Sequence, residues 1–368
     1  MKLFSLDALK VWVLAPYLRT YDANNGYYYE YSQNIEEYTK AFAELGVKWV
    51  WQPVTMDTYA SIISTINKEK EAAIDCPIVL NLCDGDEING TPGISVIKLL
   101  QHYHLSYSGA DEYFYQITTS KIPMKFAFDK ANVPNAKWEV INSKLQDTKG
   151  IFERLGHPII VKPAVGAGSL GLSVKNVVKS EAKLNALILK MFEGFRGWNL
   201  VIDGLIAEQF IAGPEFTVFI SGSYTHPSEM KIYTPVERVF HASLAAEERF
   251  ISFDRYWETY EDEEAMPNGE IFFKYALPHE NLIEKIKQIS RDAYIACKGM
   301  GYGRVDVRQD AATQKLYVLE VNAQCGLSAD EASSSLGAIL RYNNKKFHHI
   351  LSEILEDAMR RKLPSLIE

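Results

Sequence analysis

The sequence is poor in cysteine, in basic charge and in long apolar runs, and each shortage argues against a class of protein. Its 368 residues include only four cysteines, at positions 76, 83, 297 and 325, too scattered for paired metal-ligand motifs. We therefore expect reduced thiols and a cytoplasmic location. The net charge of −8 contains no long basic run, which argues against nucleic acid or an anionic membrane as partner.

No apolar stretch approaches the length of a membrane span. Asp7 and Lys10 interrupt the opening apolar segment, so we expect no signal peptide. What is present is the composition of a globular protein, 47% hydrophobic and 23% charged. A chain of this length is expected to form two or three domains.

Strands and helices are predicted to alternate in the N-terminal third. The pattern covers residues 10–16, 35–46, 48–54, 76–85 and 93–104, in the order strand, helix, strand, strand, helix. Such alternation is typical of a parallel α/β layer. A boundary is predicted near residue 120, beyond which shorter strands and helices follow.

Two segments are biased in composition. Residues 20–32 are aromatic and rich in turn formers, which fits either a substrate-facing loop or simple packing. Residues 258–270 are acidic, which is more typical of a solvated loop than of a binding site.

The stretch "YVLEVNAQC" (317–325) predicts a strand from which Glu320 and Asn322 project on one side. Upstream, "GYGRVDVRQD" (301–310) predicts a second strand with Arg304 and Asp306 on one face. The polar, turn-like link between them indicates an antiparallel hairpin.

If the hairpin turns near Thr313, Asp306 lies opposite Glu320 and Arg304 lies opposite Asn322. Two opposed carboxylates repel each other. A hard cation between them would relieve the repulsion, and Mg²⁺ favours carboxylate and amide oxygens. The alternative is a solvent-facing hairpin whose charges pair with neighbouring arginines.

The segment "GAGSLG" fits the pattern G-x-G-x-x-G, but its surroundings disfavour a dinucleotide fold. The residues that follow, "LSVKNVV", alternate like a strand rather than a helix. A loop of small residues between two strands can instead fold its N–H groups over phosphates. Lys162, in the apolar strand "PIIVKP", would bring a cation there; the alternative is a flexible hairpin with Lys162 on the surface.

Glu208 and Glu215 lie in the apolar segment "AEQFIAGPEF". Because burying an unpaired carboxylate is costly, each is expected to accept hydrogen bonds from the backbone or from a ligand.

Taken in order, five segments resemble the ATP-grasp superfamily, and specifically its D-alanine–D-alanine ligase branch. They are "TTSKIPMK", "IIVKPAVGAGSLGLSV", "IAEQFIAGPEFTV", "GYGRVDV" and "YVLEVNAQCGL". The resemblance implies an α/β fold of mixed α+β type, with ATP between two sheets. It also implies three domains, at residues 1–120, 121–207 and 208–368.

The resemblance also implies roles for individual residues. ATP contacts fall on Lys121, Lys162, Gly166, Gly168, Ser169, Gly171, Glu208, Gln209, Ile211 and Glu215. Two Mg²⁺ ions, or Mn²⁺ in their place, fall on Asp306, Glu320 and Asn322. Arg304 matches the arginine that stabilises the tetrahedral intermediate, and together with Lys121 and Lys162 forms the expected catalytic set.

The chain departs from that branch mainly where substrates bind. The early Gly-Gly-x-Ser-x-Glu motif is not visible, and "CDGDEING" stands where the branch has His-Gly. We therefore expect an altered acceptor, and the closest subgroup by resemblance is the ligases that attach an amino acid to mycosporine-glycine. A D-Ala-D-Ala or other dipeptide ligase, and a non-catalytic ATP-binding module, are alternatives; an oxidoreductase is a further one.

The substrates are expected to be a small-molecule acceptor and an amino acid. Tyr256, Ser328, Ser333 and Ser334 are expected to contact them, the serines because "CGLSADEASSSLG" follows the metal strand and opens a helix. The family likeness further implies a homodimer.

Overall fold

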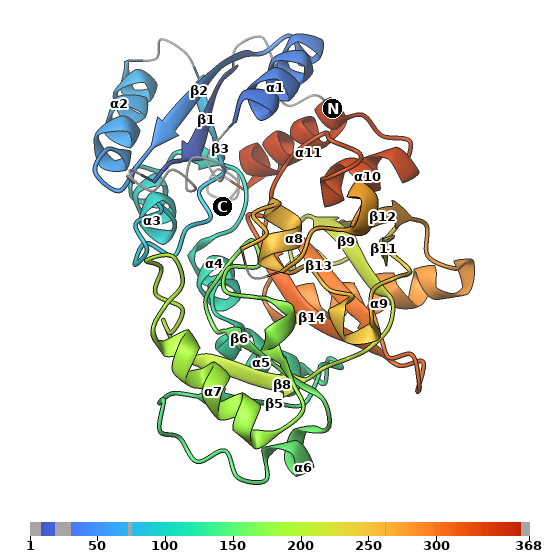
Figure 1. The fold of residues 1–368 in the computed structure, drawn as a ribbon. Helices are drawn as coiled ribbons and strands as arrows, with labels where there is room; N and C mark the ends of the chain where they lie inside the picture. The colour runs from blue at the N-terminus through green and yellow to red at the C-terminus, as the bar shows by residue number, and fades with distance from the viewer. Residues whose placement is uncertain (1–8, 19–30, 73–75, 262, 362–368) are drawn as a thin grey trace.

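Three sheets organise the chain in the computed structural model, which describes residues 9–18, 31–72, 76–261 and 263–361 (Figure 1). The first is a parallel sheet in the order β2-β1-β3-β4. Its strands are β1 (Leu9–Pro16), β2 (Lys48–Val54), β3 (Cys76–Asn81) and β4 (Ser106–Tyr107). Its helices are α1 (Ser32–Leu45), α2 (Tyr59–Glu71) and α3 (Ile94–His102). The predicted parallel α/β layer is thus confirmed, with α2 as a helix that the sequence interpretation did not include.

The second sheet is small and antiparallel, in the order β5-β8-β6-β7. Its strands are β5 (Trp138–Ile141), β6 (Ile159–Pro163), β7 (Val177–Val178) and β8 (Leu205–Gln209). Helices α6 (Ile151–Leu155) and α7 (Glu181–Phe192) belong to the same part of the chain. The sheet has an apolar cluster of its own, in which Ile159, Val161 and Leu205 pack against Leu184 and Ile188 of α7.

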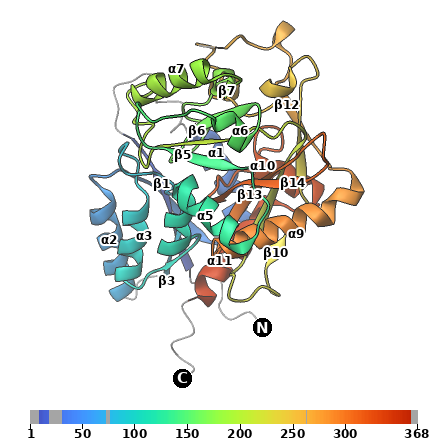
Figure 2. The ribbon, with the colours of Figure 1, turned by 90° about the horizontal axis from the view of Figure 1, so that it is seen from below.

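The third sheet is antiparallel, in the order β12-β11-β9-β13-β14, with β10 paired to β9. Its strands are β9 (Glu215–Ser221), β10 (Lys231–Ile232), β11 (Val236–Phe240), β12 (Phe273–Ala276), β13 (Tyr302–Gln309) and β14 (Leu316–Ala323). Helix α9 (Glu280–Ala296) packs against β9, β13 and β14, and Figure 2 shows it lying along this sheet. The predicted hairpin is confirmed: Asp306 lies opposite Glu320 and Arg304 opposite Asn322, with a register shift just after Asp306.

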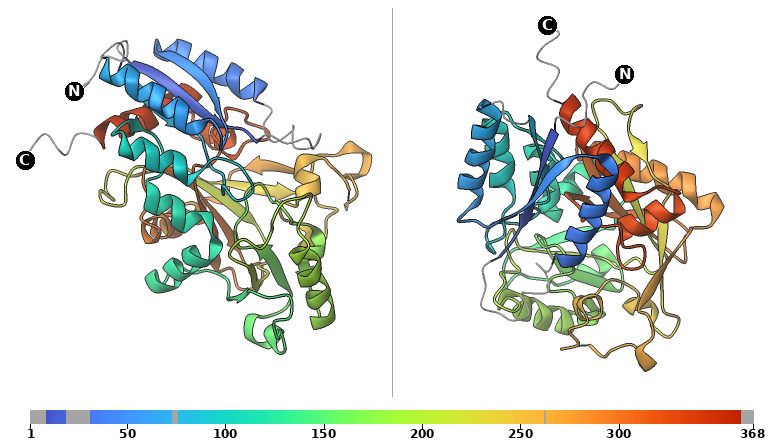
Figure 3. Two further views of the ribbon diagram at one scale, coloured as in Figure 1. Left: turned by 90° about the vertical axis from the view of Figure 1, so that its left-hand side faces the viewer. Right: turned by 90° about the horizontal axis from the view of Figure 1, so that it is seen from above.

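Of the remaining α-helices, two lie between the first and second sheets in the sequence, one lies between strands of the third sheet, and two follow its last strand. They are α4 (Glu112–Thr119), α5 (Lys121–Ala131), α8 (Phe253–Trp257), α10 (Ser335–Tyr342) and α11 (Phe347–Arg360). Helix α11 returns to pack against α1, β3 and β4, and both views in Figure 3 show the red C-terminal helices beside the blue N-terminal layer. One apolar cluster therefore joins residues of α1, such as Phe42, to residues of α11, such as Ile350.

None of the helices among the described residues combines the length and the apolar character needed to cross a bilayer. Most of the aromatic segment 20–32 falls outside the described residues. The division into three domains stays a prediction, and β8 crosses its expected boundary between residues 207 and 208.

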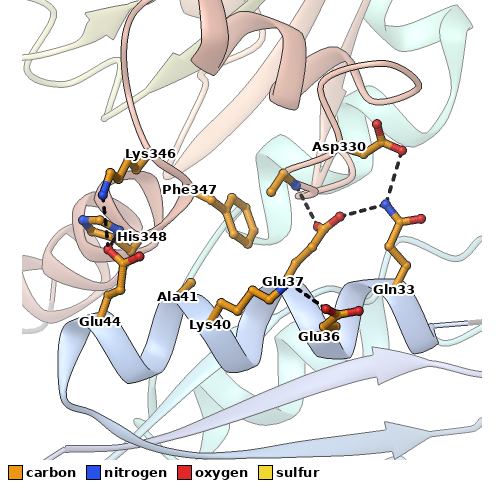
Figure 4. Close-up of a pocket in the computed structure, with 11 residues that line it drawn as sticks. Gln33, Glu36, Glu37, Lys40, Ala41, Glu44, Asp330, Lys346, Phe347 and His348 are labelled. Carbon is orange, nitrogen blue, oxygen red and sulfur yellow. Dashed lines mark hydrogen bonds and ion pairs between the residues drawn. The ribbon is translucent and has the colours of Figure 1, made fainter.

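The segment after β14 is fastened to α1 by several hydrogen bonds, two of which end on one carboxylate. Glu37 accepts hydrogen bonds from the backbone N–H of Ala329 at 2.7 Å and from Ser328 Oγ at 3.1 Å. Gln33 Nε2, one turn earlier, donates to Asp330 at 3.2 Å. Figure 4 shows Gln33, Glu37 and Asp330 between α1 and the loop before α10. The first layer therefore fixes the path of the chain as it leaves the hairpin.

Replacing Glu37 tests this tie. Glu37→Ala should lower the free energy of unfolding by roughly 1–3 kcal/mol, because the backbone N–H of Ala329 loses a charged acceptor. Glu36→Ala is the matched control, since Glu36 is exposed and its ion pair with Lys40 lies in solvent. Urea unfolding measures the free energy of unfolding of both variants. An equal loss in the two variants would contradict a stabilising role for the hydrogen bonds of Glu37.

Candidate functional site

A cavity of about 540 Å³ lies between the small sheet and the large one. It brings together most of the site residues predicted from the sequence. These are Lys121, Lys162, Gly166, Gly168, Ser169, Glu208, Gln209, Ile211, Glu215, Tyr256, Arg304, Asp306, Glu320 and Asn322. Gly171, Ser328, Ser333 and Ser334 do not line it.

The glycine-rich loop forms one wall of the cavity. It leaves β6 and passes through a 3₁₀ turn at Val174–Asn176 into β7. Gly168 and Gly171 have φ of +58° and +70°, a region that a side chain disfavours. No α-helix follows the loop directly, so the context of a dinucleotide fold is missing.

The loop and the residues just after it are fastened by Ile251, Trp257 and Glu263, which lie between β11 and β12 in the sequence. Trp257 Nε1 donates to the carbonyl oxygen of Gly168 at 2.9 Å, and Ser169 Oγ donates to that of Ile251 at 2.9 Å. Glu263 accepts from the backbone N–H of Val174 at 2.7 Å and is only 7% exposed. The interpretation of 258–270 as a solvated loop was therefore wrong at Glu263, which faces inward.

One buried glutamate at the end of β8 in the small sheet forms ion pairs with two lysines. Glu208 lies 2.6 Å from Lys162 Nζ and 2.7 Å from Lys125 Nζ, and it is 2% exposed. Burial raises the pKa of Glu208, but the two lysines outweigh burial and lower that pKa from 4.5 to about 2. The acceptor role expected for Glu208 is present, with lysines as partners rather than backbone or ligand.

The sequence interpretation missed Lys125, which is 1% exposed. A signal was available: Lys125 follows Lys121 by one helical turn in α5, so both project on the same side of that helix. Lys121 Nζ lies 3.6 Å from Glu320 and donates to the carbonyl oxygen of Gly166 at 3.3 Å. It thus links the glycine-rich loop to the hairpin.

The hairpin carries its two opposed carboxylates into the cavity. Arg304 donates to Asp306 at 3.0 Å and 3.2 Å, and Asn322 Nδ2 donates to both Asp306 and Glu320 at 3.2 Å. Burial raises the pKa of Asp306, but the charges of Arg304 and Arg238 outweigh burial and lower that pKa below its ordinary value. The carboxyl group of Asp306 therefore stays ionised. The nearby carboxylate raises the pKa of Arg304 in spite of burial.

These residues fit a hard cation. Asp306 and Glu320 provide carboxylate oxygens, and Asn322 adds an amide oxygen once its side chain turns over, because Nδ2 faces the two carboxylates in this structure. Mg²⁺ completes its shell with water and phosphate oxygens rather than with a full protein cage. Among the described residues no group of three or more His, Cys, Asp and Glu could hold a metal ion. A cation here would therefore depend on Asn322 and on oxygens of a ligand.

Glu215 is placed differently from the sequence expectation. Its carboxylate is 4% exposed, pairs closely with Arg238, and accepts from Arg308 Nε at 2.9 Å. Arginine side chains thus take the place of the backbone or ligand donors that were expected. A role in holding ribose stays a prediction, and it requires Glu215 to accept a further donor.

The three serines predicted to contact substrate do not line the cavity, whereas the serine that follows them does. Ser334 caps α10 by accepting from the N–H of Gly337, Ser333 Oγ donates to Asp330, and Ser328 donates to Glu37. Ser335, the next residue, lines the cavity. Its hydroxyl accepts from Arg238 Nη2 at 3.1 Å and lies 3.0 Å from Tyr275 Oη.

Comparison with known proteins gives a consistent result. The family described as D-ala D-ala ligase C-terminus matches residues 127–356. The D-alanine–D-alanine ligase of Pseudoalteromonas atlantica is 27% identical over 232 residues, or 62% of this chain and 63% of that protein. This chain thus aligns with less than two thirds of that relative. D-alanine–D-alanine ligase B of Xanthomonas campestris is 26% identical over 256 residues, or 68% of this chain and 69% of that protein.

Solved structures share the fold over nearly the whole chain. The D-alanine–D-alanine ligase of Bacillus anthracis complexed with ATP aligns with a TM-score of 0.66 at 17% identity, covering 96% of this chain and 99% of that one. The ligase of Coxiella burnetii aligns with a TM-score of 0.63 at 15% identity, covering 98% and 96%. The fold expected from the resemblance is confirmed.

The shared glutamate predicts a pH-dependent loss of stability. Lys125→Met should destabilise the chain by roughly 3 kcal/mol, the lower end for breaking a buried pair, because Lys162 still neutralises Glu208. The pKa of Glu208 lies below its unfolded value of 4.5. The contribution of ionised Glu208 to the free energy of unfolding is therefore complete above pH 4.5 and is lost as the pH falls toward 2.

The difference in unfolding free energy between wild type and Lys125→Met should accordingly shrink as the pH falls from 5 toward 3. Urea unfolding at several pH values measures it. Lys130→Met, an exposed lysine of the same helix, is the control and should change little at any pH. A wild-type advantage that does not depend on pH would refute the assignment of the shift to Lys125.

Proposed function

Because this chain belongs to the D-ala D-ala ligase C-terminus family, we propose that it is an ATP-dependent ligase of the D-alanine–D-alanine ligase type. It joins a carboxyl group to an amine and releases ADP and phosphate. The single observation that carries the proposal is the cavity in which Lys121, Lys162, Arg304, Asp306 and Glu320 converge. A protein that only binds nucleotide has no need of Arg304 beside the opposed carboxylates.

The reaction is proposed to run in two steps. A carboxylate oxygen of the first substrate attacks the γ-phosphorus of ATP, ADP leaves, and an acyl phosphate forms. The nitrogen of the second substrate then attacks the acyl carbon, and phosphate leaves as the C–N bond forms. Both steps concentrate negative charge at one place, so positioning and charge neutralisation supply most of the catalysis.

Residues of this chain can meet each of those demands. Lys121, Lys162 and the N–H groups of the glycine-rich loop would hold the phosphates. Arg304 would stabilise the oxygen that becomes negative when the amine attacks. Mg²⁺ held by Asp306, Glu320 and Asn322 would neutralise phosphate charge. Ile251 and Trp257, which fasten the glycine-rich loop, would help keep water from the acyl phosphate.

The narrower expectation, an acceptor of the mycosporine-glycine type, receives no support from the similar proteins. Those relatives are named as D-alanine–D-alanine ligases, and the dipeptide-ligase alternative fits them better. We therefore propose an amino acid as the first substrate as well as the second. The homodimer and the cytoplasmic location stay predictions.

Phosphate and ADP release in the presence of ATP, Mg²⁺ and single amino acids tests the activity, with D-alanine as the first candidate. Arg304→Met should lower kcat by roughly 10²–10³, as for loss of one oxyanion donor, with little change in the ATP KM. Arg341→Met, an exposed arginine of α10, is the control. Wild-type turnover in Arg304→Met would remove Arg304 from the mechanism; no ADP release with any amino acid would remove the proposed activity.

Ser335 is proposed to hold the carboxylate of the amine donor, together with Arg238. Ser335→Ala should raise the KM for that amino acid by roughly tenfold, because a hydrogen bond to a charged group is worth about 1.5–3 kcal/mol. Ser333→Ala, which lies outside the cavity, should leave it unchanged. Steady-state kinetics at saturating ATP measures the amino-acid KM of both variants. A raised KM in Ser333→Ala alone would contradict the role of Ser335 and support Ser333 as the residue that contacts the donor.

A further inference from the structure

One buried amide side chain joins the end of β14 to the first layer, which is built on β1–β4. Gln324 directly follows β14 and is only 2% exposed. Its Nε2 donates to the carbonyl oxygen of Asn81 at 2.7 Å, and its Oε1 accepts from the N–H of Ala110 at 2.8 Å. Both ends of the amide are hydrogen-bonded, which offsets the cost of burying it.

The two partners of Gln324 lie where the first layer enters the wall of the cavity. Asn81 is the last residue of β3, and the loop that follows it lines the cavity at residues 84–86. Ala110 lies just before α4, whose Thr119 also lines the cavity. A single side chain therefore contacts the starting points of two segments of the cavity wall.

Gln324 lines the cavity itself, next to residues of the large sheet that the proposed reaction needs. Glu320 and Asn322 precede it on β14. Gly326, two residues after it, also lines the cavity and begins the segment that leads to Ser335. The amide thus fixes the carboxylate end of the hairpin relative to the wall that the first layer provides.

The chain around Gln324 is shaped to accept this side chain. A Cβ atom on Gly109 would lie 1.7 Å from Oε1 of Gln324, so the amide fits only beside a glycine. Gln324 itself has φ of +53°, a region that is unfavourable for a residue with a side chain. Such a conformation persists only where the surrounding structure holds it, and it is commonest at functional sites.

We propose that Gln324 is a positioning residue, an inference that rests on the proposed ligase function. ATP is expected between the small and large sheets, and the amine donor is expected at Ser335. The wall formed by the first layer is then left for the substrate whose carboxylate receives the phosphoryl group. Gln324 keeps that wall aligned with the residues that hold the metal and the phosphates.

The alignment decides what happens to the acyl phosphate. When the amine nitrogen attacks the acyl carbon, the C–O bond to phosphate breaks and a C–N bond forms. When the first substrate is displaced from the amine, water attacks the same carbon and the same C–O bond breaks. The carboxyl group is then regenerated and phosphate leaves, so ADP has been formed without a C–N bond.

Gln324→Met tests the role, because methionine keeps the length of the side chain and removes both hydrogen bonds. ADP and dipeptide are measured separately with ATP, Mg²⁺ and the amino acid that the wild type turns over, D-alanine being tried first. The wild type should form ADP and dipeptide in equal amounts. In Gln324→Met, kcat/KM for dipeptide should fall roughly 10- to 100-fold, ADP should exceed dipeptide, and the ATP KM should change little.

Gln309→Met is the matched control for the loss of a buried amide from the same hairpin. Gln309 is 6% exposed, donates to the carbonyl oxygen of Gln314 at 3.1 Å and does not line the cavity. This variant should still form ADP and dipeptide in equal amounts, even if urea unfolding shows that it is less stable. Equal amounts in Gln324→Met, or the same excess of ADP in both variants, would overturn the positioning role.

Gln324→Asn is the second variant, for use if Gln324→Met does not fold. Asparagine tolerates positive φ, and its shorter side chain cannot reach both partners, so ADP should again exceed dipeptide. Equal amounts in this variant, or failure of both variants to fold, would reject the positioning role. A wild type that releases no ADP with any amino acid refutes the ligase proposal itself, and the role of Gln324 is refuted with it.

Discussion

The opposition of Asp306 and Glu320 across one pair of strands is the constraint on which the cavity depends. Their register places two like charges face to face, and the neighbourhood is arranged to tolerate this. Arg304 donates to Asp306, Asn322 donates to Glu320, and Lys121 of α5 forms an ion pair with Glu320. A shift by one residue would turn all of these side chains to the other face of the sheet.

The hairpin could be predicted from the sequence because it is a local feature. Polar side chains at alternate positions of an otherwise apolar strand all lie on the same face of the sheet. The short turn then fixes which residues of the two strands lie opposite each other. The parallel layer could be predicted for the same reason, since strand and helix periodicities differ. Glu208 could also be recognised as an acceptor, because its segment is too apolar to leave a carboxylate unpaired.

The partners of those acceptors could not be predicted, because they come from distant parts of the chain. Arg238, which pairs with Glu215 and Ser335, lies on β11 within a stretch that has no strong periodicity. Glu263 is buried although its neighbours in sequence are acidic and polar. Ser335 differs from Ser334 only by its position relative to the start of α10: the cap faces the helix, and the next residue faces the cavity.

The bonds that fasten the glycine-rich loop have a kinetic consequence. Trp257 and Ser169 hold the loop by hydrogen bonds, and a third joins the N–H of Phe253 to the carbonyl oxygen of Leu172. Each such bond is worth about 0.5–1.5 kcal/mol, so lifting the loop costs a few kcal/mol. Only a small fraction of unliganded molecules is then open at any moment. In the proposed ligase reaction, nucleotide binding would be slowed, and apparent affinity reduced, by that fraction. A chain whose glycine-rich loop is held more weakly would bind nucleotide faster and protect its acyl phosphate less well.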